Sequence, residues 1–193
     1  MKKIIIFISI FCSFIGNVTY SKEILSIIEG NADAKIKLII YESMTCPSCA
    51  NFHQNIFPDL KKEFIDTGEV NIEFRNFPLD LAALNASKLA HCKNDGKSEI
   101  LHFLFNKQND WVKGNNILDI NNNLKSLIDE QKFDLNFENC LNEKKIEDFI
   151  LEERIDGHKK FDIKATPTLI INDKKFDKTL NFKNIKKRLK KMI

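Results

Sequence analysis

The feature that most constrains the fold is an apolar run that is followed by a Cys-Pro-Ser-Cys motif and then by a helical pattern. Residues 35–42 are mostly apolar and rich in β-branched side chains, which predicts a buried strand. After Cys46, apolar residues recur at helical spacing as far as Leu60, and over 70–74 they alternate as in a second strand. A strand, a helix and a strand in this order predict a parallel pair joined by a right-handed crossover.

The rest of the chain adds helices and one further strand region. Residues 22–28 form a short amphipathic stretch, and a long middle segment has apolar residues at helical spacing. An apolar strand follows at 168–171, then a turn, a short second strand and a basic C-terminal helix. We therefore expect an α/β fold built from 22–79 and 158–193, with 80–157 inserted as a helical subdomain.

The N-terminus has the three parts of a secretory signal peptide. Lys2 and Lys3 precede an apolar run over 4–15, and small and polar residues follow as far as Ser21. The run is shorter than the roughly 20 residues that a membrane-spanning helix needs, so we expect cleavage near Ser21. Retention as an uncleaved anchor is the alternative. Removal of 1–21 places the mature chain in the periplasm, which is an oxidising space.

Charge and cysteine content narrow the function. The 193 residues carry 30 Lys+Arg against 27 Asp+Glu, a net charge of +3 that is too weak and too evenly spread to indicate a nucleic-acid partner. Cleavage after Ser21 removes Cys12 and leaves four cysteines, which are Cys46, Cys49, Cys92 and Cys140. An even number of cysteines in an oxidising space is typical of disulfide chemistry.

The Cys-Pro-Ser-Cys motif lies where the predicted strand ends and the helix begins. Unpaired N–H groups and the helix dipole stabilise an anion there, which favours the thiolate of Cys46. Pro47 suits the first helical turn, because it has no N–H to leave unpaired. Cys49 lies one turn further on, where it can attack a mixed disulfide formed at Cys46. A metal site is the alternative, but zinc needs a second close pair, and Cys92 and Cys140 are 48 residues apart.

Several stretches of the chain resemble the DsbA-like thiol:disulfide interchange proteins of the thioredoxin superfamily. They are 38–53 around the motif, 74–80 at the passage from the second strand into the helices, and 165–168 with the sequence Ala-Thr-Pro-Thr. Residues 108–111 and the positions of Cys92 and Cys140 are similar to the alphaproteobacterial branch of that family. The resemblance implies a thioredoxin-like fold with an inserted all-helical subdomain, and catalysis by Cys46 and Cys49 without a cofactor.

The resemblance also implies that Pro167 is cis and faces the cysteine pair. The backbone of Thr166 then faces outward, where an extended, cysteine-containing substrate segment can bind by main-chain hydrogen bonds. An ordinary loop before the strand is the alternative for Thr166 and Pro167.

Two positions depart from the family pattern. Where strongly oxidising relatives have His, Ser48 offers a neutral hydroxyl, which predicts a less acidic Cys46 and a milder oxidant. Where many relatives carry a buried acid six residues before the nucleophile, this chain has Ile40. Glu42 lies on the same face of the strand, so it either supplies part of that acid's role or is a solvated side chain.

Other conspicuous side chains fit structural roles. His53 follows the motif on the same helix face and is interpreted as a packed helix histidine rather than a proton carrier. His91 has no spacing that indicates a ligand, and Trp111 is expected in the core of the helical segment. Cys92 and Cys140 are expected to form a structural disulfide, with two free buried thiols as the alternative.

Together these inferences predict a periplasmic thiol:disulfide oxidoreductase that introduces disulfide bonds into exported proteins. Its expected substrates are unfolded, cysteine-containing exported chains, and the resemblance implies a quinone-linked membrane partner that reoxidises Cys46 and Cys49. A reductase or isomerase of the same fold is one alternative. The other belongs to a different class, a copper(I)-binding protein or a holdase that uses the same two thiols without turnover.

Overall fold

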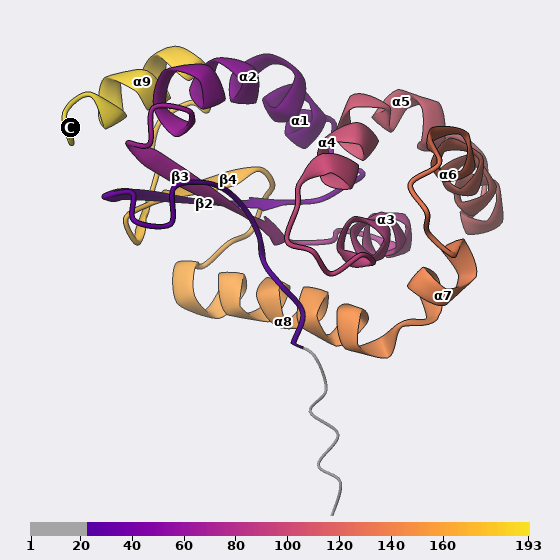
Figure 1. The fold of residues 1–193 in the computed structure, drawn as a ribbon. Coiled ribbons are helices and arrows are strands. Elements are labelled where there is room, and N and C mark those ends of the chain that lie inside the picture. The colour runs from indigo at the N-terminus through magenta and orange to yellow at the C-terminus, as the bar shows by residue number, and fades with distance from the viewer. Residues whose placement is uncertain (1–22) are drawn as a thin grey trace, which may run out of the picture.

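The computed structural model describes residues 23–193, so the predicted signal peptide, 1–21, lies outside the described residues. A five-stranded mixed sheet in the order β1-β3-β2-β4-β5 forms the centre of the fold, with helices on both faces and at one end (Figure 1). Within 23–193, no helix combines the length and the apolar character needed to cross a membrane. The arrangement confirms the expected thioredoxin-like fold with a helical insertion.

The sheet is built around β2, an apolar strand with a partner on each side. The strands are β1 (Ile27–Gly30), β2 (Ile36–Glu42), β3 (Val70–Asn76), β4 (Thr168–Ile171) and β5 (Lys174–Lys175). As predicted, β2 and β3 are parallel, from Ile36 opposite Val70 to Glu42 opposite Asn76. The other three pairs, β1 with β3, β2 with β4 and β4 with β5, are antiparallel.

Helices cover both faces of this sheet. The long helical segment after β2 comprises α1 (Pro47–Asn51), the π-helical η1 (Phe52–Ile56), α2 (Phe57–Leu60) and the π-helical η2 (Lys61–Ile65). It lies with α9 (Phe182–Leu189) on one face, and α8 (Lys144–Phe161) lies across the other (Figure 1). Pro58 lies in the first turn of α2, where the wider π-helical turn before it accommodates a residue that has no N–H to donate.

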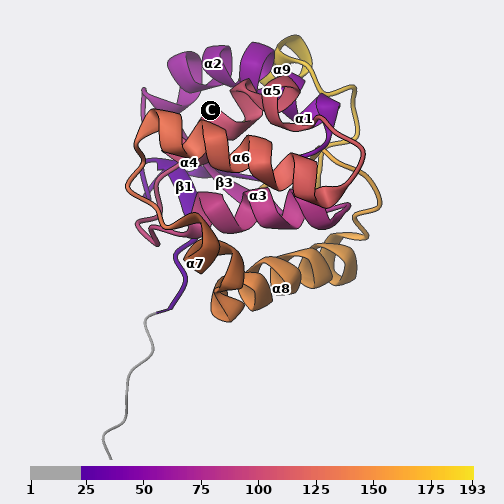
Figure 2. The same cartoon turned by 90° about the vertical axis from the view of Figure 1, so that its right-hand side faces the viewer.

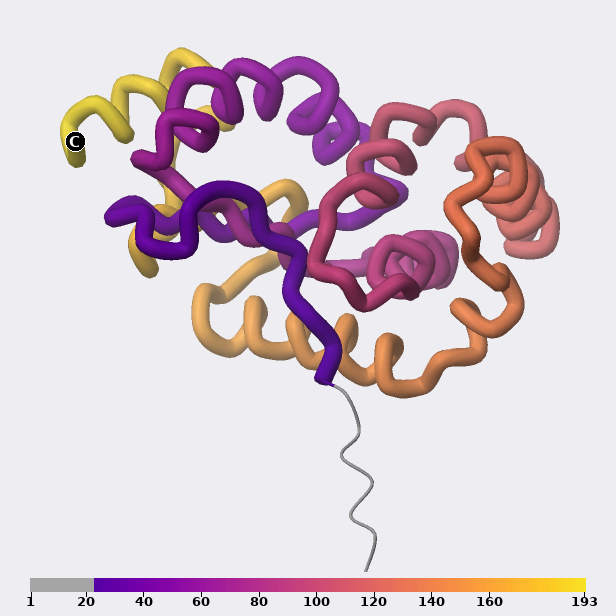
Figure 3. The backbone as a smooth tube through the Cα atoms, viewed as in Figure 1, coloured from indigo at the N-terminus to yellow at the C-terminus, as the bar shows by residue number. Residues whose placement is uncertain are grey.

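The inserted helices form a block at one end of the sheet (Figure 2). They are α3 (Leu81–His91), α4 (Glu99–Asn106), α5 (Gln108–Trp111), α6 (Ile117–Gln131) and α7 (Phe137–Asn142). Figure 3 shows the chain leaving the sheet after β3, passing through this block and returning along α8 to β4. Trp111 is fully buried in the core, as predicted.

The first strand differs from the prediction. The sequence indicated only a short amphipathic stretch over 22–28, whereas Ile27–Gly30 pairs antiparallel with β3 as an edge strand. Four residues are too few for a period of two to stand out, and pairing with β3 decides their conformation. Gly30 ends this strand with a φ of 101°, and a Cβ there would lie 2.6 Å from the Val70 carbonyl oxygen, so the position requires glycine.

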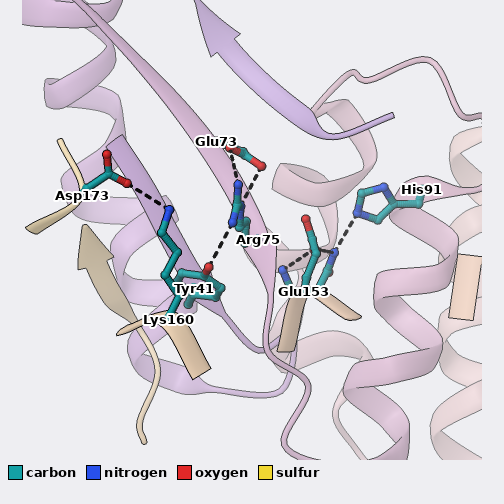
Figure 4. Close-up of polar contacts among 8 residues, drawn as sticks. Tyr41, Glu73, Arg75, His91, Glu153, Lys160 and Asp173 are labelled. Atoms are coloured by element: carbon teal, nitrogen blue, oxygen red, sulfur yellow. Dashed lines mark hydrogen bonds and ion pairs between the residues drawn. The ribbon is translucent and has the colours of Figure 1, made fainter. Parts of the chain in front are cut away.

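A buried polar cluster fastens α8 to the sheet (Figure 4). The Glu153 carboxylate accepts hydrogen bonds from the Asn76 backbone N–H at 2.8 Å and from Asn76 Nδ2 at 2.7 Å. Asn76 Nδ2 also lies 2.9 Å from His91 Nε2, and nearby Arg75 donates to the Tyr41 hydroxyl. Burial raises the pKa of Glu153 to about 7. The cluster holds the end of β3 against both α8 and α3.

Cys92 and Cys140 form a disulfide, as predicted. Cys92 follows the last residue of α3, and Cys140 lies in α7, 48 residues further along the chain. The bond therefore joins the first inserted helix to the last one before α8.

Replacing both of these cysteines by alanine is expected to lower the free energy of unfolding by about 4 kcal/mol, because the bond restricts the unfolded chain over a long loop. Urea denaturation of the mature protein, followed by circular dichroism, measures this loss. A loss below about 1 kcal/mol would contradict a stabilising role for the bond.

Candidate active site

The Cys-Pro-Ser-Cys motif occupies the junction between β2 and α1. Cys46 is the N-terminal cap of the helix, with φ −78° and ψ 119°, and Pro47 lies in the first turn. Cys46 is partly exposed, Pro47 and Ser48 are exposed, and Cys49 is fully buried. The motif thus presents one sulfur toward solvent and keeps the other inside, which is the arrangement expected of a nucleophile and a resolving thiol.

The fold shifts the pKa values of the two thiols in opposite directions. A hydrogen bond from the Cys49 thiol, with the backbone N–H groups of Cys49 and Ser48, lowers the pKa of Cys46 to about 5 against the effect of partial burial. Burial raises the pKa of Cys49, and the hydrogen bond with Cys46 and the charge of Glu42 raise it further. At neutral pH Cys46 is therefore a thiolate and Cys49 a thiol. Ser48, which precedes Cys49, acts on Cys46 through its backbone N–H.

The loop before β4 brings Thr166 and Pro167 to the motif. The Thr166–Pro167 peptide bond is cis, as the family resemblance implied. Cys46 Sγ lies 3.3 Å from the Thr166 carbonyl oxygen, to which it donates a hydrogen bond in the thiol form. The fold thus joins two segments that are 120 residues apart in the sequence.

Side chains from the helical block and its entrance hold the active-site loop. The Gln108 amide, in α5, donates to the carbonyl oxygens of Met44 at 2.8 Å and Cys46 at 3.0 Å. Asp80, the N-terminal cap of α3, accepts a hydrogen bond from the Thr45 hydroxyl at 2.7 Å. Neither Gln108 nor Asp80 could be assigned to the site from the sequence, because no local pattern connects them with a motif so far away in the chain.

Glu42, the last residue of β2, is buried. Its exposure of 4% excludes the alternative of a solvated side chain. Glu42 Oε2 lies 2.8 Å from His53 Nε2, whereas Oε1 has no hydrogen-bond partner among the described residues. Burial raises the pKa of Glu42 well above its usual value and lowers the pKa of His53 to about 3. His53 is packed in the core, as interpreted, but it also contacts a carboxyl group that its place in the sequence did not indicate.

A groove of about 610 Å³ runs beside Cys46, between the active-site loop and the helical block. Leu79, Leu81 and Val112 line it and are 51%, 55% and 37% exposed. Apolar side chains left exposed beside a reactive sulfur form a surface suited to the apolar segments of another chain.

Within the described residues, Cys46 and Cys49 are the free cysteines. No group of three or more His, Cys, Asp or Glu side chains in residues 23–193 is placed to hold a metal ion. Two neighbouring thiols, one acidic and one not, are suited to thiol–disulfide exchange through a mixed disulfide.

Known proteins share this sequence pattern. The chain matches the family model described as thioredoxin over residues 22–191. Disulfide bond formation protein D of Bacillus subtilis is 29% identical over 174 residues, which are 85% of this chain and 75% of that protein. A curated relative from Rickettsia bellii is 41% identical over 100 residues, 51% of this chain and 39% of the relative. The chain thus spans less than two thirds of the length of the Rickettsia relatives that it matches.

Solved structures share the fold. The crystal structure of Wolbachia pipientis α-DsbA1 has a TM-score of 0.75 and 30% identity, and the match covers 86% of this chain and 89% of that chain. The crystal structure of oxidised BdbD from Bacillus subtilis has a TM-score of 0.70 and 25% identity, with coverage of 88% and 98%. These matches confirm the resemblance to DsbA-like proteins. The chain therefore belongs to the thioredoxin family, and its fold is that of the DsbA proteins.

Proposed function

We propose that this chain is a periplasmic thiol:disulfide oxidoreductase that introduces disulfide bonds into exported proteins through Cys46 and Cys49. The observation that carries the proposal is that the fold shifts the pKa values of the two thiols in opposite directions. The pKa of Cys46 is lowered to about 5, and that of the buried Cys49 is raised. A thiolate that is stable at neutral pH stabilises the reduced pair, so the oxidised pair readily gives its disulfide to other thiols. This favours an oxidase over a reductase of the same fold.

Disulfide transfer proceeds through one mixed disulfide. A substrate thiolate attacks Cys46 Sγ in the oxidised pair, the bond between Cys46 and Cys49 breaks, and Cys49 leaves with the electron pair and takes up a proton. A second substrate thiolate attacks the substrate sulfur of the mixed disulfide, forms the substrate's own disulfide and releases Cys46 as a thiolate. The low pKa of Cys46 favours this release, because a more acidic thiol is the better leaving group.

The groove beside Cys46 and the Thr166–Pro167 loop supply the substrate site. Leu79, Leu81 and Val112 contact apolar side chains of an unfolded chain, and the backbone of Thr166 adds main-chain hydrogen bonds to an extended segment. The name of the Bacillus subtilis relative, disulfide bond formation protein D, supports a role in forming disulfide bonds.

The compartment and the electron acceptor complete the proposal. Cleavage near Ser21 releases the mature chain into the periplasm, and a quinone-linked membrane protein reoxidises the cysteine pair after each turnover. On this proposal the mature chain divides into a thioredoxin-like part, 22–79 and 158–193, and a helical insertion, 80–157. The pattern of charged, apolar and small residues at the N-terminus supports export.

The reduction potential of the cysteine pair tests the direction of electron flow. The mature protein is equilibrated in glutathione buffers, and its oxidised fraction is measured by mass spectrometry after acid quenching. We expect a potential between about −120 and −180 mV, where proteins that donate disulfides lie. A potential near about −270 mV would identify a reductant and contradict the proposal. The Cys92→Ala/Cys140→Ala variant is the matched control, since the motif thiols are the only ones left in its mature chain that can be oxidised or reduced.

Single substitutions in the motif test the two roles. Cys46→Ser is expected to abolish oxidation of a reduced, unfolded substrate, because the nucleophile is lost. Cys49→Ser cannot form the internal disulfide, so it is mixed instead with a substrate that carries a disulfide. Its Cys46 thiolate is expected to attack that disulfide and to accumulate the mixed disulfide, because the resolving thiol is lost. Non-reducing gel electrophoresis separates the adducts. Accumulation of the same adducts by Cys46→Ser would reverse the assignment.

The pKa of Cys46 also makes the stability of the reduced protein depend on pH. The thiol titrates near 9.0 in an unfolded chain and at about 5 in the fold. The thiolate therefore stabilises the fold fully above about pH 9, and this contribution declines as the pH falls to about 5. Urea denaturation is expected to show that the free energy of unfolding of the reduced protein decreases as the pH falls over this range. The oxidised protein, in which Cys46 does not titrate, is expected to lack this decrease. An equal pH dependence of the two forms would contradict the shift.

A further inference from the structure

Four polar side chains form an unbroken line through the core, from the end of β2 to the edge strand β1. Glu42 Oε2 lies 2.8 Å from His53 Nε2, and the Nδ1 atoms of His53 and His102 are 2.8 Å apart. His102 Nε2 lies 2.5 Å from Glu29 Oε1. Glu29 also contacts Lys61, whose side chain is 42% exposed. The line is therefore buried at its Glu42 end and reaches solvent at its Glu29 end.

Aromatic rings enclose the two histidines of this line. Phe105 stacks on His53 with the ring centroids 4.1 Å apart, and Phe57 stacks on His102 at 4.6 Å. Phe74 contacts both, at 5.4 Å from His53 and 5.3 Å from His102. These apolar rings bury the His53 imidazole completely and leave that of His102 partly exposed, at 21%. The polar atoms of His53 therefore have only the neighbouring groups of the line as partners.

The contacts fix how many protons the line holds. Each of the three contacts needs one proton, because it joins two atoms that are acceptors when unprotonated. Three protons shared among two carboxyl groups and two imidazoles leave a net charge of −1. If each proton moves across its own contact, a line with Glu42 protonated and Glu29 ionised becomes one with Glu42 ionised and Glu29 protonated. No side chain has to change its position for this shift.

The surroundings of the two carboxyl groups set the resting arrangement. Burial raises the pKa of Glu42. Against the effect of its own burial, hydrogen bonds from His102 and Ser98 lower the pKa of Glu29 to about 2. In the resting line, the carboxyl group of Glu42, at the end near the motif, is therefore protonated. The carboxyl group of Glu29 carries the negative charge.

We propose that this line carries protons between Cys49 and solvent, with Glu42 as the group that exchanges the proton with the thiol. The inference rests on the proposed function and makes His53, His102 and Glu29 positioning residues that act through Glu42. Glu42 Oε1 is buried and has no hydrogen-bond partner among the described residues, so it can accept a proton. The charge of Glu42 also raises the pKa of Cys49, so the two groups interact electrostatically in the core. Cys49 and His53 are both buried and lie one turn apart on the same helical segment.

The proton balance is simplest when Cys49 resolves a mixed disulfide. The Glu42 proton first moves outward along the line, and Glu29 releases a proton to water. Cys49 then gives its proton to Glu42, and its electron pair forms the bond to Cys46 while the bond from Cys46 to the other sulfur breaks. The leaving thiolate is protonated by water. Oxidation of a substrate follows the same steps in reverse, so that Cys49 leaves and receives its proton from Glu42.

Reaction of the reduced protein with glutathione disulfide separates the step that needs the line from the step that does not. The Cys46 thiolate first forms a mixed disulfide with glutathione, and Cys49 then resolves it; acid quenching and mass spectrometry follow both species. We expect His102→Gln to keep the first rate within about twofold of wild type and to slow the second at least about tenfold, because an amide does not pass a proton on. Glu29→Gln, at the outer end of the line, is expected to behave in the same way without disturbing the core.

The control is His91→Gln, which replaces a buried histidine outside the line, and both of its rates are expected to match wild type. Glu42→Gln and Glu42→Gln/His102→Gln are expected to resolve the adduct at equal rates, because residues on one path are not additive. Wild-type resolution by His102→Gln and Glu29→Gln, or equal slowing of both steps, would overturn the proton path. A wild-type protein that forms the adduct and never resolves it would instead refute the proposed function.

Discussion

The backbone pairing of β2 with β4 decides where the two halves of the active site meet. The last pair of these strands places Tyr41 opposite Thr168. The Thr166–Pro167 bond lies just before this pair, so the register brings it beside the residues that follow Tyr41, among them Cys46. A slip of one residue in this pairing would turn the side chains of β4 to the opposite faces and move the proline loop away from the motif. The reactive groups of the site thus depend on hydrogen bonds in which none of them takes part.

Each face of the sheet buries one carboxyl group, and the two differ in their partners. Glu153 Oε2 accepts two hydrogen bonds from Asn76, so its place between α8 and β3 is fixed by donors that no reaction needs to release. Glu42 has one short contact, to His53, and an oxygen with no partner among the described residues. A buried carboxyl group that is incompletely bonded is costly for stability, and such a cost is typical of a group retained for proton exchange.

Much of this fold could be predicted because its signals are local. The strand over 35–42, the helix after Cys46, the cis bond before Pro167 and the bond between Cys92 and Cys140 each follow from short patterns or from the resemblance that they carry. The strand Ile27–Gly30 could not be predicted, because its four residues have no pattern of their own and become a strand through pairing with β3.

The surroundings of the motif were beyond prediction for a related reason. The partner of Glu42 lies 11 residues away in the sequence, and the next group in the line, His102, lies a further 49 residues on, in a helix of the insertion. The period of two places Glu42 on the same face of the strand as Ile40, and spacing places His53 on the helix face of Cys49, but neither shows which side chains meet there. Contacts between separate elements arise only when the elements pack together.

The two hydrogen bonds of Gln108 make the helical block a structural support of the active-site loop. Its amide satisfies the carbonyl oxygens of Met44 and Cys46 in a loop that has no repeating structure of its own. Without α5, the Met44 oxygen would lose its donor, at a cost of about 1–3 kcal/mol if water could not take its place. The Cys46 oxygen would keep the N–H groups of Cys49 and Ala50 as donors. In this chain the smaller thioredoxin core is therefore an incomplete module, since the segment added to it supplies the framework that shapes its most reactive turn.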